Sequence, residues 1–247
     1  DRLHNSQKDF IRRHIGPSEK DQEKMLKDLN FKSLDEFINS TIPEKIQLKG
    51  ELNIGEPNSE YEALRKLKAI SKKNQIYSNF IGMGYYGTYT PYVILRNILE
   101  NPGWYTSYTP YQPEVAQGRL EMLLNFQQMI VDFTGMDIAN ASLLDEGTAA
   151  AEAMGLSHRL NKSDSNLVFV SENCHPQTID VIQTRAEPMG LKVLVGNEDK
   201  VLEQLKEDIV CGVLQYPGTL GDIKDPSEAI SKIHKKNGKA ILVCDLL

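Results

Sequence analysis

Residues 166–195 read NLVFVSENCHPQTIDVIQTRAEPMGLKVLV: a strand-like run, a helical stretch and a second strand-like run. NLVFV and LKVLV are short, continuously apolar and rich in β-branched residues, which is typical of strands buried on both faces. Residues 176–189 begin with a proline, a common first residue of a helix. A strand, a helix and a strand in this order predict a parallel pair joined by a crossover helix.

The same alternation continues along the chain. IVCGVLQY at 209–216 and AILVCD at 240–245 are further strand-like runs, and helices are expected near 199–207 and 226–236. We therefore expect residues 140–247 to form a partial α/β domain with a doubly wound, mostly parallel sheet covered on both faces. Because the sequence stops inside a strand–helix unit, we expect a fragment truncated within the sheet domain.

Residues 1–65 are expected to form a helical N-terminal arm. Ser18 with Asp21, and Ser59 with Glu62, have the spacing of capping boxes at helix starts.

Residues 66–139 contain a segment rich in Tyr, Gly and Pro. Eight of the ten tyrosines and the single tryptophan lie between Tyr77 and Tyr111. Glycines and prolines interrupt regular structure there, and irregular backbone that carries aromatic groups often lines pockets. The open alternative is that the rings cap a core and leave their hydroxyls in water.

Two helices are expected within residues 66–139. Thr90 is expected to be the N-cap of one and Pro91 its first residue. The other, the longest of the chain, is expected to run from about Pro113 to Phe133 and to pack deeply by its apolar face.

The bulk composition excludes several classes of protein. A net charge of -6 argues against nucleic-acid binding, which needs a dense basic face. No apolar run approaches the roughly 20 residues of a membrane span. The three cysteines, Cys174, Cys211 and Cys244, lack metal-binding spacing, so no metal site is expected, and their number fits a reducing compartment.

Polar residues follow the predicted strands at the carboxyl edge of the sheet, where doubly wound sheets bind ligands. Glu146, Gly147 and Thr148 open an alanine-rich helix just after Asp145, and their amides could hold a phosphate or carboxylate. A plain capped helix is the alternative, and Glu146 would repel an anion.

His175 and Asp245 each allow two interpretations. The His175 ring could cover the face of a planar cofactor, or it could cap the helix that begins at Pro176. The Asp245 carboxylate could pair with a protonated ring nitrogen, or it could cap the next element.

A turn before a helix, a ring after one strand and an aspartate after a later strand occur here in the order found in the large domain of fold-type-I pyridoxal-phosphate enzymes. Longer stretches are similar to one family. YTPYQPEVAQGRLEMLLNFQ, NASLLDEGTAAAEAM and CHPQT resemble the N-terminal half of glycine decarboxylase, the P-protein of the glycine cleavage system. FIRRHIGPS and IGMGYYGTYTPYVILRNILENPGW are also similar, and the resemblance runs from about Phe10 to Leu247.

The resemblance implies a site shared between two halves. In that family pyridoxal phosphate is held by a lysine of the C-terminal half, which this chain does not contain, so this chain alone is expected to be inactive. Five residues would be degenerate counterparts of cofactor contacts: Glu146, Gly147, Thr148, His175 and Asp245. Seven would line the substrate pocket: Tyr108, Thr109, Tyr111, Gln112, Glu114, Tyr85 and Tyr86.

The family reaction decarboxylates glycine and transfers the aminomethyl group to the lipoyl group of H-protein. The resemblance therefore implies as partners glycine, lipoylated H-protein and the C-terminal half, fused or as a separate subunit, in a homodimer or heterotetramer. The implied compartment is the bacterial cytoplasm, with the mitochondrial matrix as the alternative.

Two other functions stay open at this point. One is another fold-type-I enzyme, an amino-acid decarboxylase or aminotransferase with its own cofactor site here. The other is a non-catalytic scaffold subunit, which tyrosines buried in this chain's own core would favour.

Overall fold

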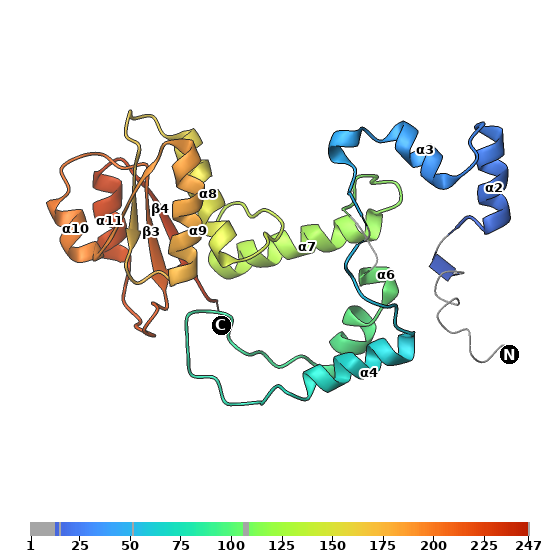
Figure 1. Ribbon diagram of the computed structural model, residues 1–247. Coiled ribbons are helices and arrows are strands. Elements are labelled where there is room, and N and C mark those ends of the chain that lie inside the picture. Colours follow the sequence, from blue (N-terminus) through green and yellow to red (C-terminus); the bar gives the residue numbers. More distant parts are fainter. Residues whose placement is uncertain (1–12, 15, 51, 106–108, 247) are drawn as a thin grey trace. The chain divides into compact units, whose positions relative to one another are not determined.

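The computed structural model describes residues 13–14, 16–50, 52–105 and 109–246 (Figure 1). The chain divides into two compact units, Asp1–Ser78 and Asn79–Leu247. The predicted divisions near residues 65 and 139 are finer than this split and stay predictions.

The first unit is helical, as expected for an N-terminal arm. Both predicted capping boxes are present: Ser18 and Asp21 bond reciprocally at the start of one helix, and Ser59 and Glu62 at the start of another. The helices of this unit are α2 (Glu19–Asp28), α3 (Leu34–Thr41), the short 3-10 helix η2 (Glu44–Ile46) and α4 (Glu60–Ser71).

The second unit begins with short helical pieces. They are α5 (Tyr92–Ile94), the π-helix η3 (Leu95–Leu99) and α6 (Pro102–Tyr105). The prediction that Thr90 caps this region was wrong. Pro91 is the N-cap, because its backbone is extended (ψ 143°) while its carbonyl already accepts from the amides of Ile94 and Leu95.

The long helix α7 (Gln117–Thr134) begins four residues later than predicted. Pro113 lies instead in a turn, in which Val115 and Ala116 donate to the carbonyls of Gln112 and Pro113.

The prediction that α7 packs deeply was also wrong. None of its residues is buried, and Leu124 and Phe133 are 65% and 69% exposed. Its better-covered apolar residues, such as Phe126 and Ile130, are only half-buried within the described part of the chain.

The four strands form one parallel sheet in the order β2-β1-β3-β4, as the predicted alternation required. The strands are β1 (Leu167–Ser171), β2 (Lys192–Gly196), β3 (Cys211–Tyr216) and β4 (Lys239–Cys244). β2 lies on one side of β1 in the sheet. The chain then crosses back over β1, so β3 lies on the other side of β1. The carboxyl ends of β1 and β3 therefore flank the point where the strand order reverses, the usual ligand site of such sheets.

Helices cover both faces of the sheet (Figure 1). Side chains of α8 (Glu146–Leu160) and α9 (Pro176–Ala186) form one core cluster with the sheet, and those of α10 (Glu198–Gln204) and α11 (Ser227–Lys235) form the other. The short 3-10 helix η4 (Glu187–Met189) follows α9. Small residues let α8 and α9 approach closely, since a Cβ on Gly147 would lie 3.3 Å from Val181. The predicted α/β class, covered on both faces, is confirmed.

Candidate functional site

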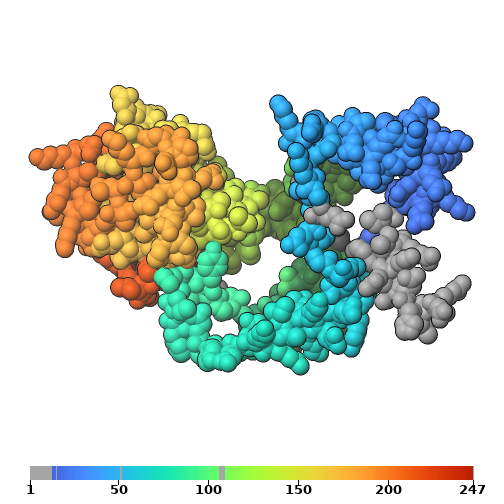
Figure 2. Space-filling view, in the orientation of Figure 1, coloured from blue at the N-terminus to red at the C-terminus, as the bar shows by residue number. Residues whose placement is uncertain are grey.

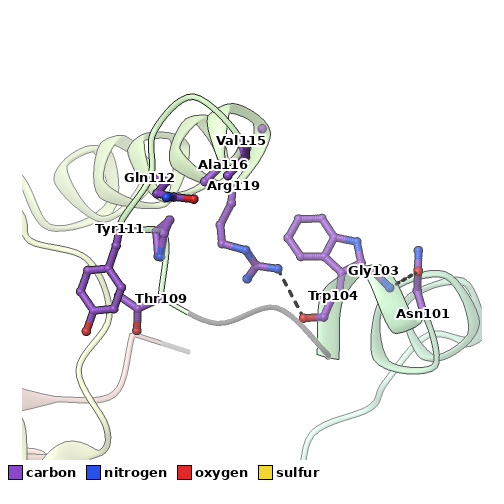
Figure 3. Close-up of a pocket in the computed structure, with 11 residues that line it drawn as sticks. Asn101, Gly103, Trp104, Thr109, Tyr111, Gln112, Val115, Ala116 and Arg119 are labelled. Carbon is purple, nitrogen blue, oxygen red and sulfur yellow. Dashed lines mark hydrogen bonds between the residues drawn. The ribbon is translucent and has the colours of Figure 1, made fainter. Parts of the chain in front are cut away.

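An open cleft of about 910 Å³ lies where the tyrosine-rich segment meets the start of α7 (Figure 3). Its lining comes from α6, the following loop and the first turn of α7: Asn101, Gly103, Trp104, Thr109, Pro110, Tyr111, Gln112, Val115, Ala116, Gly118 and Arg119. Hydroxyl, amide and guanidinium groups thus share one cleft with aromatic rings, a combination suited to a small polar ligand.

Arg119 crosses the base of this cleft. Its guanidinium carbon lies 5.1 Å from the centroid of the Trp104 ring, within the range of a cation–π contact. Its Nη2 also donates to the Trp104 carbonyl at 3.3 Å. These two contacts tie α7 to α6 across 15 residues of chain, so they hold both ends of the segment that carries Thr109 and Tyr111.

The predicted pocket residues fall into separate places. Thr109, Tyr111 and Gln112 line the cleft together. Glu114 does not line this cleft; it lies in a neighbouring groove of about 460 Å³ beside α7. Tyr108 lies outside the described residues.

Tyr85 and Tyr86 belong to a different loop, at the edge of the sheet. Tyr85 is 73% exposed and Tyr86 47%. This loop is one of the few places with left-handed backbone at residues other than glycine, since φ is 64° at Met83 and 53° at Tyr85.

The turn before α8 is a plain capped helix start, which is the simpler of the two interpretations of this segment. Asp145 accepts from the Thr148 amide at 2.8 Å, and the hydrogen bonds from Thr148 lower the pKa of the Asp145 carboxyl. Glu146 is the first helical residue, and its Oε1 is buried without a hydrogen-bond partner among the described residues.

His175 is buried at the carboxyl end of β1 and occupies the N-cap position of α9. The prediction that its ring caps this helix was wrong, because the imidazole Nδ1 instead bonds Thr219 Oγ1 at 3.1 Å. Thr219 gives its single hydroxyl proton to the Asn173 carbonyl, so Nδ1 of the imidazole is assigned as the donor. The other ring nitrogen, Nε2, faces Glu146 Oε1 at 3.8 Å.

Asp245 directly follows β4, at the same edge of the sheet. Its amide donates to the Tyr216 carbonyl at 3.1 Å and so extends the pairing of β4 with β3 by one residue.

These residues do not fit pyridoxal phosphate. A phosphate at the start of α8 would meet the Glu146 carboxylate, and the Thr148 amide is already taken by Asp145. A planar ring on His175 would meet the backbone at Gly84, where a Cβ would be only 3.3 Å from the imidazole.

A second polar cluster is formed by Ser171, Glu198 and Lys224. The buried Glu198 accepts from Ser171 Oγ at 2.7 Å and from Lys224 Nζ at 3.3 Å. Burial acts to raise the pKa of Glu198, but these bonds outweigh it and the pKa is lowered. The cluster encloses only about 50 Å³, so it is a structural network and not a ligand pocket.

The cysteines offer no reactive thiolate. Burial raises the pKa of both Cys174 and Cys211 to about 12. Within the described ranges, no group of three or more His, Cys, Asp or Glu side chains is arranged to hold a metal ion. No helix of the described chain is long and apolar enough to cross a membrane.

Sequence reasoning missed several residues at these two places. Arg119 is a charged residue at a position where the 3.6-residue spacing of α7 calls for an apolar one, and that exception was the available signal for the cleft. Gln177 and Thr219, which contact the loop and His175 at the sheet edge, gave no signal because their partners are distant in sequence.

Comparisons of the sequence and the structure with known proteins point to one family. The family described as "Glycine cleavage system P-protein" matches residues 12–247. The chain is 79% identical over 245 residues to a glycine dehydrogenase (decarboxylating) of Pelagibacter ubique (strain HTCC1062), covering 99% of this chain and 25% of that protein. It is 54% identical over 238 residues to the enzyme of the same name from Stutzerimonas stutzeri (strain A1501), covering 96% and 24%.

A solved structure is similar over most of the chain. The crystal structure of a glycine decarboxylase (P-protein) of the glycine cleavage system, in inhibitor-bound form, superposes with a TM-score of 0.82 at 29% identity, covering 94% of this chain and 53% of that one. The chain spans about a quarter of the length of the curated relatives that it matches.

Proposed function

We propose that the complete protein decarboxylates glycine and passes the aminomethyl group to the lipoyl group of H-protein, because this chain belongs to the glycine cleavage system P-protein family. The observation that carries this proposal is the family match over residues 12–247. The relatives' shared name, glycine dehydrogenase (decarboxylating), supports the same reaction.

We propose further that pyridoxal phosphate is held by the C-terminal half, outside this chain. The cofactor supplies the electron sink for loss of the carboxylate. The Glu146 carboxylate at the start of α8 and the loop over His175 support this division, because both occupy space that the cofactor would need.

The part of the site contributed by this chain is a wall that orients the substrate. Thr109 and Tyr111 offer hydroxyl groups and Gln112 an amide, and the three face one open cleft (Figure 3). Hydrogen bonds from such groups can hold the ammonium and carboxylate ends of glycine in one orientation, and closure by the other half would exclude water. Tyr85, Tyr86, Tyr108 and Glu114 belong to the same proposed wall.

The exposure of these tyrosines disfavours a scaffold role. Tyr111 is 75% exposed, and the phenols of the described segment are not buried in this chain's own core. Phenols exposed in this way can contact a substrate.

The proposed partners are glycine, the C-terminal half and lipoylated H-protein, in a homodimer or heterotetramer. The bacterial sources of the relatives support the bacterial cytoplasm as the compartment.

The test is glycine turnover by the complete protein with lipoylated H-protein, followed as release of radiolabelled carbon dioxide. Tyr111→Ala and Gln112→Ala are each expected to lower turnover at least tenfold, about 1.4 kcal/mol in the barrier. Tyr61→Ala is the matched control, since Tyr61 is 73% exposed and lies on α4. No turnover by the unaltered protein would refute the reaction, and near-normal turnover by both variants would remove the cleft from the site.

A further inference from the structure

The loop of residues 82–86, in the Tyr/Gly-rich segment, is fastened to the carboxyl edge of the sheet. Gln177, on the first turn of α9, donates from Nε2 to the Met83 carbonyl at 2.8 Å. Gly82 lies beside the Thr219 backbone, since a Cβ on Gly82 would be 3.7 Å from the Thr219 carbonyl oxygen. In Figure 2 the green-cyan atoms of this loop lie against the orange atoms of the α/β domain.

Glycine is strongly favoured at the centre of this contact. Gly84 has a φ of 78°, which other residues rarely adopt. A Cβ there would also lie 3.3 Å from His175 Cδ2, 3.5 Å from His175 Nε2 and 3.5 Å from Glu146 Oε2. The Gly84 backbone therefore lies close to the edge of the imidazole and to the carboxylate.

The surface beneath Gly84 is held rigidly. His175 is only 2% exposed, and its Nδ1 proton is committed to Thr219, whose hydroxyl proton is committed to the Asn173 carbonyl. This chain of bonds fixes the plane of the imidazole, because rotation of the ring would break the bond to Thr219. Glu146 is fixed at its backbone as the first residue of α8.

We propose that Glu146, His175 and Gln177 form a seat for residues 82–86 and are positioning residues that set where Tyr85 and Tyr86 stand in the substrate pocket. Glu146 and His175, which would contact a cofactor in a functional fold-type-I site, thereby hold a piece of this chain instead. The role of the two tyrosines in the pocket rests on the proposed function, whereas the seat itself rests only on the contacts described above.

The test uses the complete protein and two variants that act from opposite sides of the contact. Gly84→Ala adds a Cβ against the seat, and Gln177→Ala removes the hydrogen bond to Met83. Gly87→Ala is the control for the first, because nothing lies within 4 Å of a Cβ at Gly87 and its φ is not left-handed. Gln183→Ala is the control for the second, because Gln183 is an exposed residue of the same helix α9.

Two measurements are made on each variant. The rate of chymotrypsin cleavage after Tyr85 and Tyr86 in limited proteolysis is expected to rise at least tenfold in Gly84→Ala and Gln177→Ala, because a released loop is cut faster, and to stay unchanged in the controls. The KM for glycine is expected to rise at least tenfold in Gly84→Ala with a smaller change in kcat, because misplaced tyrosines weaken substrate orientation while the visible absorbance of bound cofactor stays the same.

The two measurements separate the possible failures. Unchanged cleavage in both variants would overturn the seat. Faster cleavage with an unchanged KM would overturn the positioning role of Tyr85 and Tyr86. Faster cleavage in a protein whose unaltered form does not turn over glycine would refute the proposed function and leave the seat standing.

Discussion

The contact between Arg119 and Trp104 predicts that the cleft opens when the guanidinium is removed. Arg119→Met keeps most of the side-chain length but loses both the ring contact and the hydrogen bond to the Trp104 carbonyl. A cation–π contact at a partly exposed site contributes about 0.5–1 kcal/mol. A hydrogen bond from a charged donor contributes about 1 kcal/mol after a discount for exposure to solvent. The sum, about 1.5–2 kcal/mol, shifts the equilibrium between the tied and open segment by more than about tenfold.

The assay follows from the composition of the chain. Because the 247-residue chain has one tryptophan, fluorescence excited at a wavelength that its tyrosines do not absorb reports Trp104 alone. Acrylamide quenching is expected to increase in Arg119→Met. Arg119→Lys is expected to lie between the two, because an ammonium can stay over the ring but lacks the planar fork of a guanidinium.

The control is Arg96→Met, which removes a charge from the exposed surface of η3 in the same unit. It is expected to leave quenching at the unaltered value. Equal quenching in Arg119→Met and the unaltered chain would refute the claim that Arg119 holds this segment.

Three further predictions concern stability of the α/β domain, measured by denaturant unfolding. Gly212→Ala is expected to lower the free energy of unfolding by about 1–3 kcal/mol, because its Cβ would lie 2.6 Å from Ile233 Cγ1, and Ile233→Val in the same chain should recover part of the loss. Asp145→Ala is expected to weaken the start of α8. Since the pKa of Asp145 is lowered in the folded state, its contribution is full above the unfolded pKa and is lost as pH falls through the folded pKa, so the difference from the unaltered chain should vanish in acid. Lys224→Met is expected to cost about 1–2 kcal/mol at neutral pH, since it leaves the buried Glu198 carboxylate without its cation. The pKa of Glu198 is lowered as well, so this cost should shrink as pH falls through that pKa, and a pH-independent cost would contradict the ion-pair explanation.

The class of fold could be predicted because it is encoded locally. Continuous apolar runs such as residues 209–216 are typical of strands covered on both faces, and a segment with helical periodicity precedes or follows each run. The order of the strands could not be predicted in the same way. It depends on which strand β3 pairs with, and that choice is made by packing between elements that are far apart in sequence.

The prediction that α7 is deeply buried was wrong for a related reason. Its periodicity indicates an apolar face, and that indication was right about the pattern. A pattern says that a face needs cover but does not say which element supplies it. Within the described part of the second unit the cover of α7 is incomplete, and Phe133 stays largely exposed.

The candidate site shows the same limit at the level of single residues. Thr109, Tyr111 and Gln112 are neighbours in sequence, so their common cleft could be expected from the segment alone. The contact of Gln177 with Met83 joins residues 94 apart, and neither residue type is distinctive. Such a pair becomes visible only when the sheet has placed α9 beside the loop.

Electrostatics explains why the edge of this sheet can keep its fold and yet hold a loop in place of an anion. The amides at the start of α8 favour negative groups, worth about 0.3–1 kcal/mol each, and Asp145 and Glu146 supply them from within the chain. A phosphate brought within about 4 Å of the Glu146 carboxylate would meet a repulsion of about 4 kcal/mol per pair of charges at an effective dielectric of about 20. That repulsion exceeds what the helix start can return, so the site is closed to a further anion while its own carboxylates stay. A neutral backbone carries no such penalty, and Gly84 is the residue that brings it close enough to fill the space.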